Sequence, residues 1–178
     1  RYRHRQLDLI VNPNIISTFR LRSKIISETR KFLDSNGFLE VDTPVLQPVY
    51  GGANARPFRT FHNTLDQNLF MRIAVELYLK RLIIGGIEKV YELGKNFRNE
   101  GMDRNHNPEF TMLEIYEAYK DVYHIADFIE KLIKYIAKNI DKDKIEYGEN
   151  KIDFTKSFKK TTMAEELQNA TDKDVLIM

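Results

Sequence analysis

Two alternating runs of residues, separated by a short polar loop, constrain the fold of this chain more than any other feature. The stretch Tyr91–Tyr119 reads YELGKNFRNEGMDRNHNPEFTMLEIYEAY, with glycine, aspartate, asparagine, arginine and histidine at its centre. This pattern predicts two strands joined as a hairpin. Because successive side chains of a strand point to opposite faces, residues two apart share a face. We therefore expect a hairpin with one apolar and one polar face.

The predicted polar face combines charged groups with aromatic rings. A guanidinium beside carboxylates and a flat ring suits a ligand that carries phosphate, amine and an aromatic base. From the residues alone, a structural salt bridge between Arg98 and Glu100 is the alternative, with Phe110 in the core. We place five side chains on this face: Arg98, Glu100, Phe110, Glu114 and Tyr116.

Composition sets broad limits on the chain. Its 178 residues fit one domain with a real core, and its net charge of only +2 does not by itself indicate nucleic-acid binding. It has no cysteine, which excludes disulfides and thiolate metal sites and fits a reducing compartment such as the cytoplasm. No apolar run approaches the ~20 residues that span a bilayer, so we expect no membrane partner.

The remaining pattern predicts an α+β fold, an antiparallel sheet flanked by helices. Helical spacing and capping signals predict helices over 15–36, 74–84 and 121–139, and a capping box at 162–165 predicts a short further helix. Alternation and turn signals predict strands over 38–46, 57–64 and 69–73, and a short strand over 151–154. Pro44 limits the first of these strands to an edge or an irregular position.

Two segments resemble the signature motifs of class II aminoacyl-tRNA synthetases. The sequence GFLEVDTPVL over 37–46 resembles motif 1, and Phe97-Arg98-Asn99-Glu100 followed by His106, Phe110 and Glu114 resembles motif 2. Within the class, RYRHRQLDLI, GGANARPF and RIAVELYLKRL look like lysyl-tRNA synthetases. The resemblance is dense from Arg1 to about Tyr123 and thin beyond it.

The resemblance implies an enzyme that activates lysine with ATP and transfers it to tRNA(Lys). It gives Arg98 the catalytic role of binding the α-phosphate and the lysine carboxylate. It assigns ATP binding to five residues: Arg98, Glu100, His106, Asn107 and Phe110. It assigns lysine binding to another five: Gly52, Glu76, Arg98, Glu114 and Tyr116. From position alone, Glu76 could instead be an acid that stabilises the first turn of its helix, and Gly52 could simply permit a turn.

The resemblance also implies partners and a domain organisation. It predicts a homodimer through 15–46 and contact of the tRNA acceptor end near the 101–107 loop. The chain reads as a partial catalytic domain over 1–178, with a lead-in at 1–14, the motif 1 helix and strand at 15–46, the motif 2 hairpin at 91–119 and a helix with an insertion-like segment at 121–178.

Three departures from the family pattern stand out. The third motif of the class and the N-terminal anticodon-binding barrel are absent, and Val75 replaces the usual proline. We therefore expect no metal ligands within this chain, Mg²⁺ ligands beyond Met178, and no useful lysyl-adenylate formation by the chain alone. Two alternatives stay open: a paralogue that lysylates a protein, and a non-catalytic dimerisation module.

Overall fold

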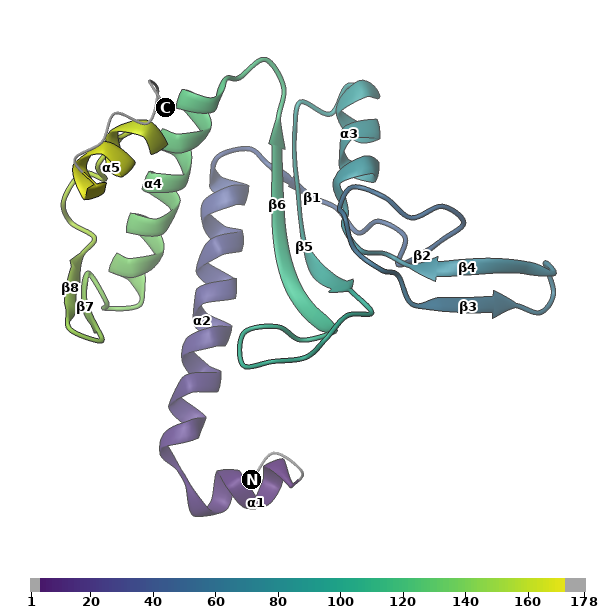
Figure 1. Ribbon diagram of the computed structural model, residues 1–178, viewed down its shortest axis with the longest axis horizontal. Helices are drawn as coiled ribbons and strands as arrows, with labels where there is room; N and C mark the ends of the chain where they lie inside the picture. The colour runs from purple at the N-terminus through teal and green to yellow at the C-terminus, as the bar shows by residue number, and fades with distance from the viewer. Residues whose placement is uncertain (1–3, 172–178) are drawn as a thin grey trace. The chain divides into compact units, whose positions relative to one another are not determined.

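The structure is a computed structural model that describes residues 4–171. Helices and strands make it an α+β fold, as the sequence predicts. The chain divides into two compact units, Thr29–Val122 and a unit composed of Arg1–Glu28 with Tyr123–Met178. The elements follow one another as α1 (Arg5–Val11), α2 (Asn14–Ser35), β1 (Leu39–Glu40), β2 (Leu46–Gln47), β3 (Arg59–His62), β4 (Gln67–Met71), α3 (Glu76–Ile84), β5 (Lys89–Phe97), β6 (Glu109–Glu117), α4 (Val122–Asn139), β7 (Lys144–Tyr147), β8 (Asn150–Asp153) and α5 (Met163–Thr171) (Figure 1).

The long hairpin β5–β6 dominates the unit Thr29–Val122. Its strands pair antiparallel from Lys89 opposite Glu117 to Phe97 opposite Glu109, and β1 pairs parallel with β5 on the other side. This confirms the hairpin predicted from the alternating pattern. A second sheet has the order β2-β4-β3 and extends away from the hairpin (Figure 1).

The two faces of β5–β6 are covered by different groups. On one face Leu79 of α3 and Val75, directly before that helix, form a buried cluster with Val90 of β5, and Tyr116 packs against it. On the other face Tyr91 is buried, and its hydroxyl donates hydrogen bonds to Asp34 at 2.9 Å and to Glu40 at 3.1 Å. Burial, together with these carboxylates, raises the pKa of Tyr91. Because the cluster at α3 lies at the Val90–Tyr116 pair, the helix covers only that end of the polar face.

The strand predicted over 38–46 is wrong, because the segment divides between the two sheets. β1 pairs with β5, whereas β2 pairs with β4. Between them, the N–H of Thr43 donates to a side chain, the carboxylate of Glu92, at 3.2 Å. Pro44 then has no N–H to offer to a neighbouring strand. These two residues prevent a continuous ladder.

The hairpin β3–β4 is shorter than predicted and its turn lies earlier. His62 pairs with Gln67, so the turn occupies 63–66 instead of 65–68. Asp66 has φ +48°, a left-handed conformation that aspartate tolerates in turns. The second strand therefore starts at Gln67, two residues before the predicted start at Leu69.

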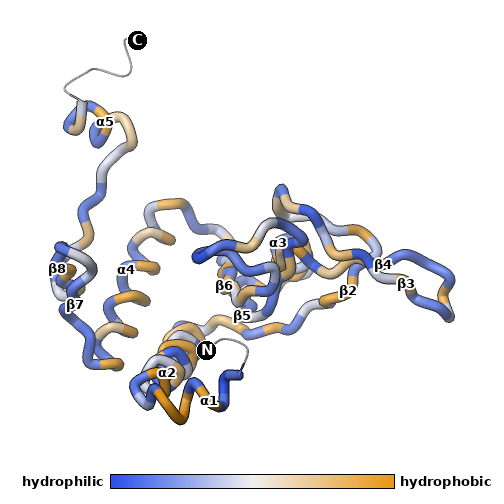
Figure 2. The backbone as a smooth tube through the Cα atoms, turned by 60° about the horizontal axis from the view of Figure 1, so that its bottom comes forward, coloured by the Kyte–Doolittle hydropathy of each residue, from blue (hydrophilic) through white to orange (hydrophobic). Residues whose placement is uncertain are grey.

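The other unit contains helices and a small hairpin. Helix α4 confirms the amphipathic helix predicted over 121–139, and apolar residues recur along it in Figure 2. Its buried side chains are Phe128, Leu132 and Ala137. The capping box before α5 is also confirmed, because Thr162 N–H donates to Glu165 and Glu165 N–H donates to Thr162 Oγ1.

Two elements of this unit were not predicted. Helix α1 forms within the lead-in, and β7 pairs with the predicted strand β8. Gly148, at φ +60°, occupies the turn between these strands. Within residues 4–171, no helix combines the length and the apolar character needed to cross a membrane.

Candidate active site

Strand register brings the predicted site residues of the hairpin to one face. Asn96 lies opposite Phe110, and Glu92 lies opposite Glu114. Beyond the last pair of the ladder, the N–H of Arg98 donates to Pro108 O at 2.8 Å. The polar face therefore continues into the loop that joins the strands.

Arg98 lies over the ring of Phe110. Its Cζ is 5.1 Å from the ring centroid, and its Nε donates a long hydrogen bond of 3.4 Å to Ile73 O. Among residues 4–171 the structure gives Arg98 no ion pair, and Glu100 instead accepts the N–H of Arg56 at 3.2 Å. The alternative Arg98–Glu100 salt bridge is therefore wrong. A half-buried guanidinium without a counter-charge is available to an anionic ligand.

One cavity gathers all five residues predicted to bind ATP. It measures about 190 Å³ and opens beside the loop between β5 and β6. An aromatic ring, an arginine, a histidine and a carboxylate in one hollow provide a stacking surface, positive charge and a hydrogen-bond acceptor. The lining residues are Arg98, Glu100, Gly101, Asn105, His106, Asn107 and Phe110.

A tight turn inside the loop orients His106. Asp103 Oδ1 accepts the N–H groups of Asn105 at 2.7 Å and His106 at 2.8 Å. The ring Nδ1 of His106 lies 2.9 and 2.8 Å from the two carboxylate oxygens of Asp103. Hydrogen bonds from Asn105 and His106 lower the pKa of Asp103. Because a carboxylate only accepts, His106 Nδ1 carries the proton and Nε2 stays available to a ligand.

Three of the residues predicted to bind lysine, Glu76, Glu114 and Tyr116, lie near one another. Tyr116 Oη donates to Glu114 Oε2 at 2.9 Å. Burial, then this hydrogen bond and the charges of Glu114 and Glu76, raise the pKa of Tyr116. Glu76, the first residue of α3, also pairs with Lys80 at 2.5 Å. Two carboxylates near one phenol form a surface suited to a cationic group.

Gly52 lies against the start of α3. At φ +84° it has a conformation that strains other residues, and a Cβ added there would lie 3.0 Å from Glu76 Cβ and 3.2 Å from Ala74 Cβ. The close approach of backbone to Glu76 is therefore built into the GGANARPF loop. The role of Gly52 in lysine binding stays a prediction.

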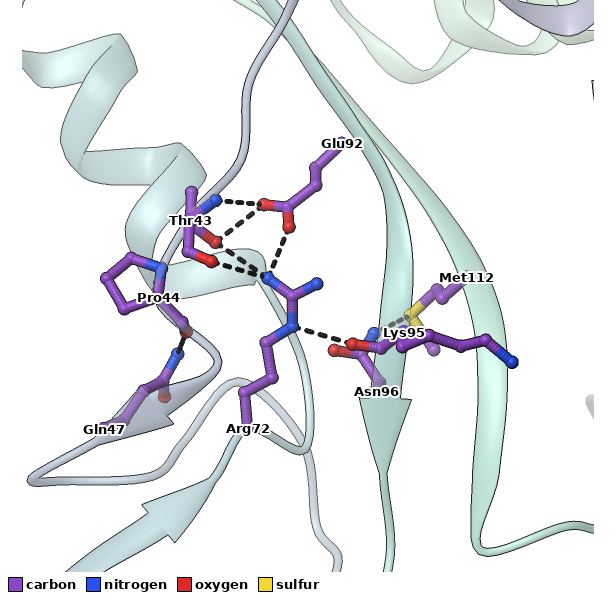
Figure 3. Close-up of polar contacts among 8 residues, drawn as sticks. All are labelled: Thr43, Pro44, Gln47, Arg72, Glu92, Lys95, Asn96 and Met112. Carbon is purple, nitrogen blue, oxygen red and sulfur yellow. Dashed lines mark hydrogen bonds and ion pairs between the residues drawn. The ribbon is translucent and has the colours of Figure 1, made fainter. Parts of the chain in front are cut away.

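A buried cluster next to this face was missed by sequence reasoning. The guanidinium of Arg72, only 2% exposed, donates to Glu92 and to Thr43 O at 3.0 Å (Figure 3). Its Nε donates to Lys95 O at 2.8 Å, and Thr43 Oγ1 donates to Glu92 at 2.6 Å. The signals were present: a charge inside the apolar run LFMRIAV, and Gly94 inside a strand, which indicates close approach of another group.

The described residues contain no candidate metal centre. Within residues 4–171, no three histidine, cysteine, aspartate or glutamate side chains are grouped so that they could hold an ion. We therefore assign no metal-binding role to any of the described residues.

Comparison with known proteins gives the family of this chain. The model described as tRNA synthetases class II (D, K and N) matches residues 1–176. The chain is 54% identical over 175 residues to a lysine–tRNA ligase of Aquifex aeolicus, 52% over 175 residues to one of Clostridium tetani, and 51% over 174 residues to one of Malacoplasma penetrans. These matches cover 98% of this chain but 29%, 35% and 36% of the relatives, so the chain spans about a third of their length. The chain belongs to the class II tRNA synthetases of the D, K and N group.

Proposed function

We propose that this chain is part of a lysine–tRNA ligase, which activates lysine with ATP and transfers it to tRNA(Lys). The observation that carries the proposal is the position of Arg98 over Phe110, on the same hairpin face as the Glu114–Tyr116 pair. One face thus offers a phosphate-binding cation, a stacking ring and an ammonium-binding carboxylate. The relatives named lysine–tRNA ligase support this reading.

The first step of the proposed reaction requires stabilisation of charge on phosphate. A lysine carboxylate oxygen attacks the α-phosphorus, a P–O bond forms, the bond to the bridging oxygen breaks, and pyrophosphate leaves with that electron pair. Negative charge develops on the α-phosphate oxygens, and a positioned guanidinium stabilises it without a covalent protein intermediate. Arg98 fills this role, since its fork can bind a phosphate oxygen and the substrate carboxylate together.

The cavity residues divide the binding of ATP among them. Phe110 stacks on the adenine, and Glu100 reads the adenine edge. His106, whose Nδ1–H donates to Asp103, would donate a second hydrogen bond from Nε2–H to the outer phosphates when both ring nitrogens are protonated. Asn107 supplies a polar amide at the same wall of the cavity. Mg²⁺ would neutralise phosphate charge when it is bound with ATP.

Lysine selection rests on carboxylates. We assign the ε-ammonium to Glu114 with Tyr116, the α-ammonium to Glu76, and the carboxylate to Arg98, with Gly52 allowing close approach. A carboxylate ~4 Å from an ammonium gains roughly 4 kcal/mol at an effective dielectric constant near 20. A neutral amino acid would leave the half-buried Glu114 without a counter-charge, so the site rejects it as well as favouring lysine.

The proposed ligase has two macromolecular partners. The tRNA acceptor end approaches the 101–107 loop, which borders the cavity. A second copy pairs through 15–46, where large apolar side chains are exposed, and sedimentation of the full-length protein at micromolar concentration should show a dimer. These exposed side chains are Ile16, Phe19, Leu39, Val45 and Leu46.

Lysine-dependent ATP–pyrophosphate exchange by the full-length protein tests the proposal. We expect exchange with lysine and much less with methionine or leucine. Glu114→Gln keeps the shape and removes the charge, so it should raise the KM for lysine by a factor corresponding to about 2 kcal/mol or more. Glu109→Gln is the matched control, because Glu109 lies on the same strand in an exposed pair with Lys95 at 3.0 Å. Exchange independent of lysine, or an equal effect of both variants, would contradict the proposal.

A further inference from the structure

Arg72 occupies the junction between the two sheets of the unit Thr29–Val122. It is the first residue after β4, and its N–H donates to Val45 O at 2.8 Å, next to β2. Its carbonyl accepts the N–H of Phe97, the last residue of β5, at 3.0 Å. Its side chain reaches Lys95 O on the same strand (Figure 3). Backbone and side chain of one residue therefore connect three segments.

The residues around the Arg72 guanidinium leave space for it and satisfy its charge. At Gly94 an added Cβ would lie 2.5 Å from Arg72 Nη2 and 3.3 Å from Glu92 Oε1, so strand β5 lacks a side chain where the guanidinium crosses. Glu92 accepts from Arg72, from Thr43 N–H and from Thr43 Oγ1, which satisfies the buried carboxylate. A buried ion pair generally stabilises a fold no better than well-packed apolar residues. Conformational specificity is the better explanation of a pair so fully bonded.

The segment held by this pair also contacts Arg98. Arg98 Nε donates to Ile73 O, and Arg98 follows Phe97 directly in sequence. Both the backbone entry and the side chain of Arg98 therefore rest on residues 72–73. A shift of this segment would move the guanidinium away from the ring of Phe110.

The Arg72–Glu92 ion pair also reduces the repulsion between two facing carboxylates. Glu92 lies directly opposite Glu114 in the ladder, on the same face of the hairpin. Like charges at opposite positions repel, and Arg72 neutralises Glu92. Glu114 then remains the carboxylate without a counter-charge in this cross-strand pair, which suits a cationic ligand.

We propose that Arg72 is a positioning residue of the ligase reaction: held across Gly94 by Glu92 and Thr43, it fixes the end of β5 so that Arg98 lies over Phe110. Its positive charge also compensates the negative charge of Glu92, which would otherwise repel a negative charge on Glu114. Arg72 itself does not contact the substrate. The inference rests on the proposed function for its kinetic consequences, but its structural claim concerns Arg98 alone.

A charge-free double variant of the full-length protein separates positioning from stability. Arg72→Met/Glu92→Met removes both charges and leaves no buried charge unpaired, so we expect it to fold. With Arg98 displaced by about 1 Å, kcat for lysine-dependent exchange should fall about 100-fold. Lys95→Met/Glu109→Met removes an exposed ion pair from the same two strands and should leave kcat within threefold of the wild type. A folded Arg72→Met/Glu92→Met variant with wild-type kcat would overturn the proposal.

A conservative variant provides a second test of the proposal. Arg72→Lys keeps the charge, but a single amine cannot bond to Glu92, Thr43 and Lys95 O together. We expect a folded protein whose kcat lies between those of the wild type and the double variant. If the double variant does not fold, a wild-type kcat in Arg72→Lys overturns the proposal and a reduced kcat with cooperative unfolding supports it.

An NMR measurement distinguishes failure of this inference from failure of the proposed function. The Arg98 Nε–H resonance, assigned by its loss in Arg98→Ala, reports the ring current of Phe110 without any activity. We expect it to move toward the position of an exposed arginine in the Arg72 variants. An unchanged resonance would refute the positioning role even if exchange is lysine-dependent. A protein without lysine-dependent exchange would refute the function while leaving the resonance test intact.

Discussion

Two arginines lie near the same hairpin face, and their surroundings differ sharply. Arg72 is buried, ion-paired with Glu92 and bonded to backbone carbonyls on both sides. Arg98 is half-buried and contacts a ring and one distant carbonyl. A buried charge needs a partner of opposite charge, whereas a partly exposed charge is solvated and can remain unpaired until a ligand binds. The first arginine therefore organises the site and the second is available for chemistry.

The largest expected effect on stability comes from breaking the buried pair. Glu92→Gln removes the charge that compensates Arg72, and loss of one partner of a buried pair costs about 3–5 kcal/mol. Thermal unfolding of the full-length protein should show a large fall in the midpoint. A midpoint equal to that of the wild type would mean that Arg72 does not depend on Glu92.

The largest expected effect on activity comes from the unpaired arginine. Arg98→Ala should reduce lysine-dependent exchange by about 100- to 1,000-fold, because loss of one donor to a developing oxyanion costs about 2.7–4 kcal/mol. The unfolding midpoint should stay close to that of the wild type. Arg81→Ala is the matched control, since Arg81 lies 4.8 Å from the Tyr78 ring in α3 and lines no part of the cavity. Loss of stability in place of activity would make Arg98 a structural residue.

A smaller effect should follow from loosening the loop. Asp103→Ala removes three contacts that hold the turn and the tautomer of His106, so the KM for ATP should rise roughly threefold to tenfold with little change in kcat. Asp103→Asn should recover part of the loss, because the amide oxygen still accepts the two backbone N–H groups.

The same contact has a pH dependence with a definite sign. The pKa of Asp103 is lowered in the folded loop, so its stabilising contribution is present above the unfolded pKa and is lost as the pH falls through the folded pKa. The KM for ATP of the wild type should therefore change little around neutral pH on account of this group. A KM that falls when Asp103 is removed would contradict its role in orienting His106.

Sequence reasoning reached the hairpin and its polar face for a definable reason. The period of two in β5 and β6 is local information, and it determines that Arg98, Phe110 and Glu114 share a face once the strands pair. The family resemblance supplied Gly52 and Glu76, which alternation alone could not connect to that face. The proximity of these two residues is a tertiary fact, expressed in the 3.0 Å approach at Gly52.

The features that the sequence did not predict all depend on contacts between residues that are far apart in the sequence. The pairing of Arg72 with Glu92 spans 20 residues of sequence, and Thr43 joins from 49 residues before Glu92. The strand predicted over 38–46 breaks because Thr43 bonds to this cluster instead of to a neighbouring strand. Local propensity contains no information on such contacts, so the charge within LFMRIAV and the glycine within β5 could only indicate that a partner exists.

A crystal structure of the full-length protein with a non-hydrolysable lysyl-adenylate analogue tests the difference between the two arginines most directly. We predict that the Arg98 guanidinium contacts the phosphate mimic beside Phe110 and that the lysine ammonium lies within about 4 Å of Glu114. Arg72 should keep its bonds to Glu92 and Thr43 without touching the ligand. A ligand bound by Arg72, or seated away from the β5–β6 face with Arg98 unengaged, would contradict this prediction.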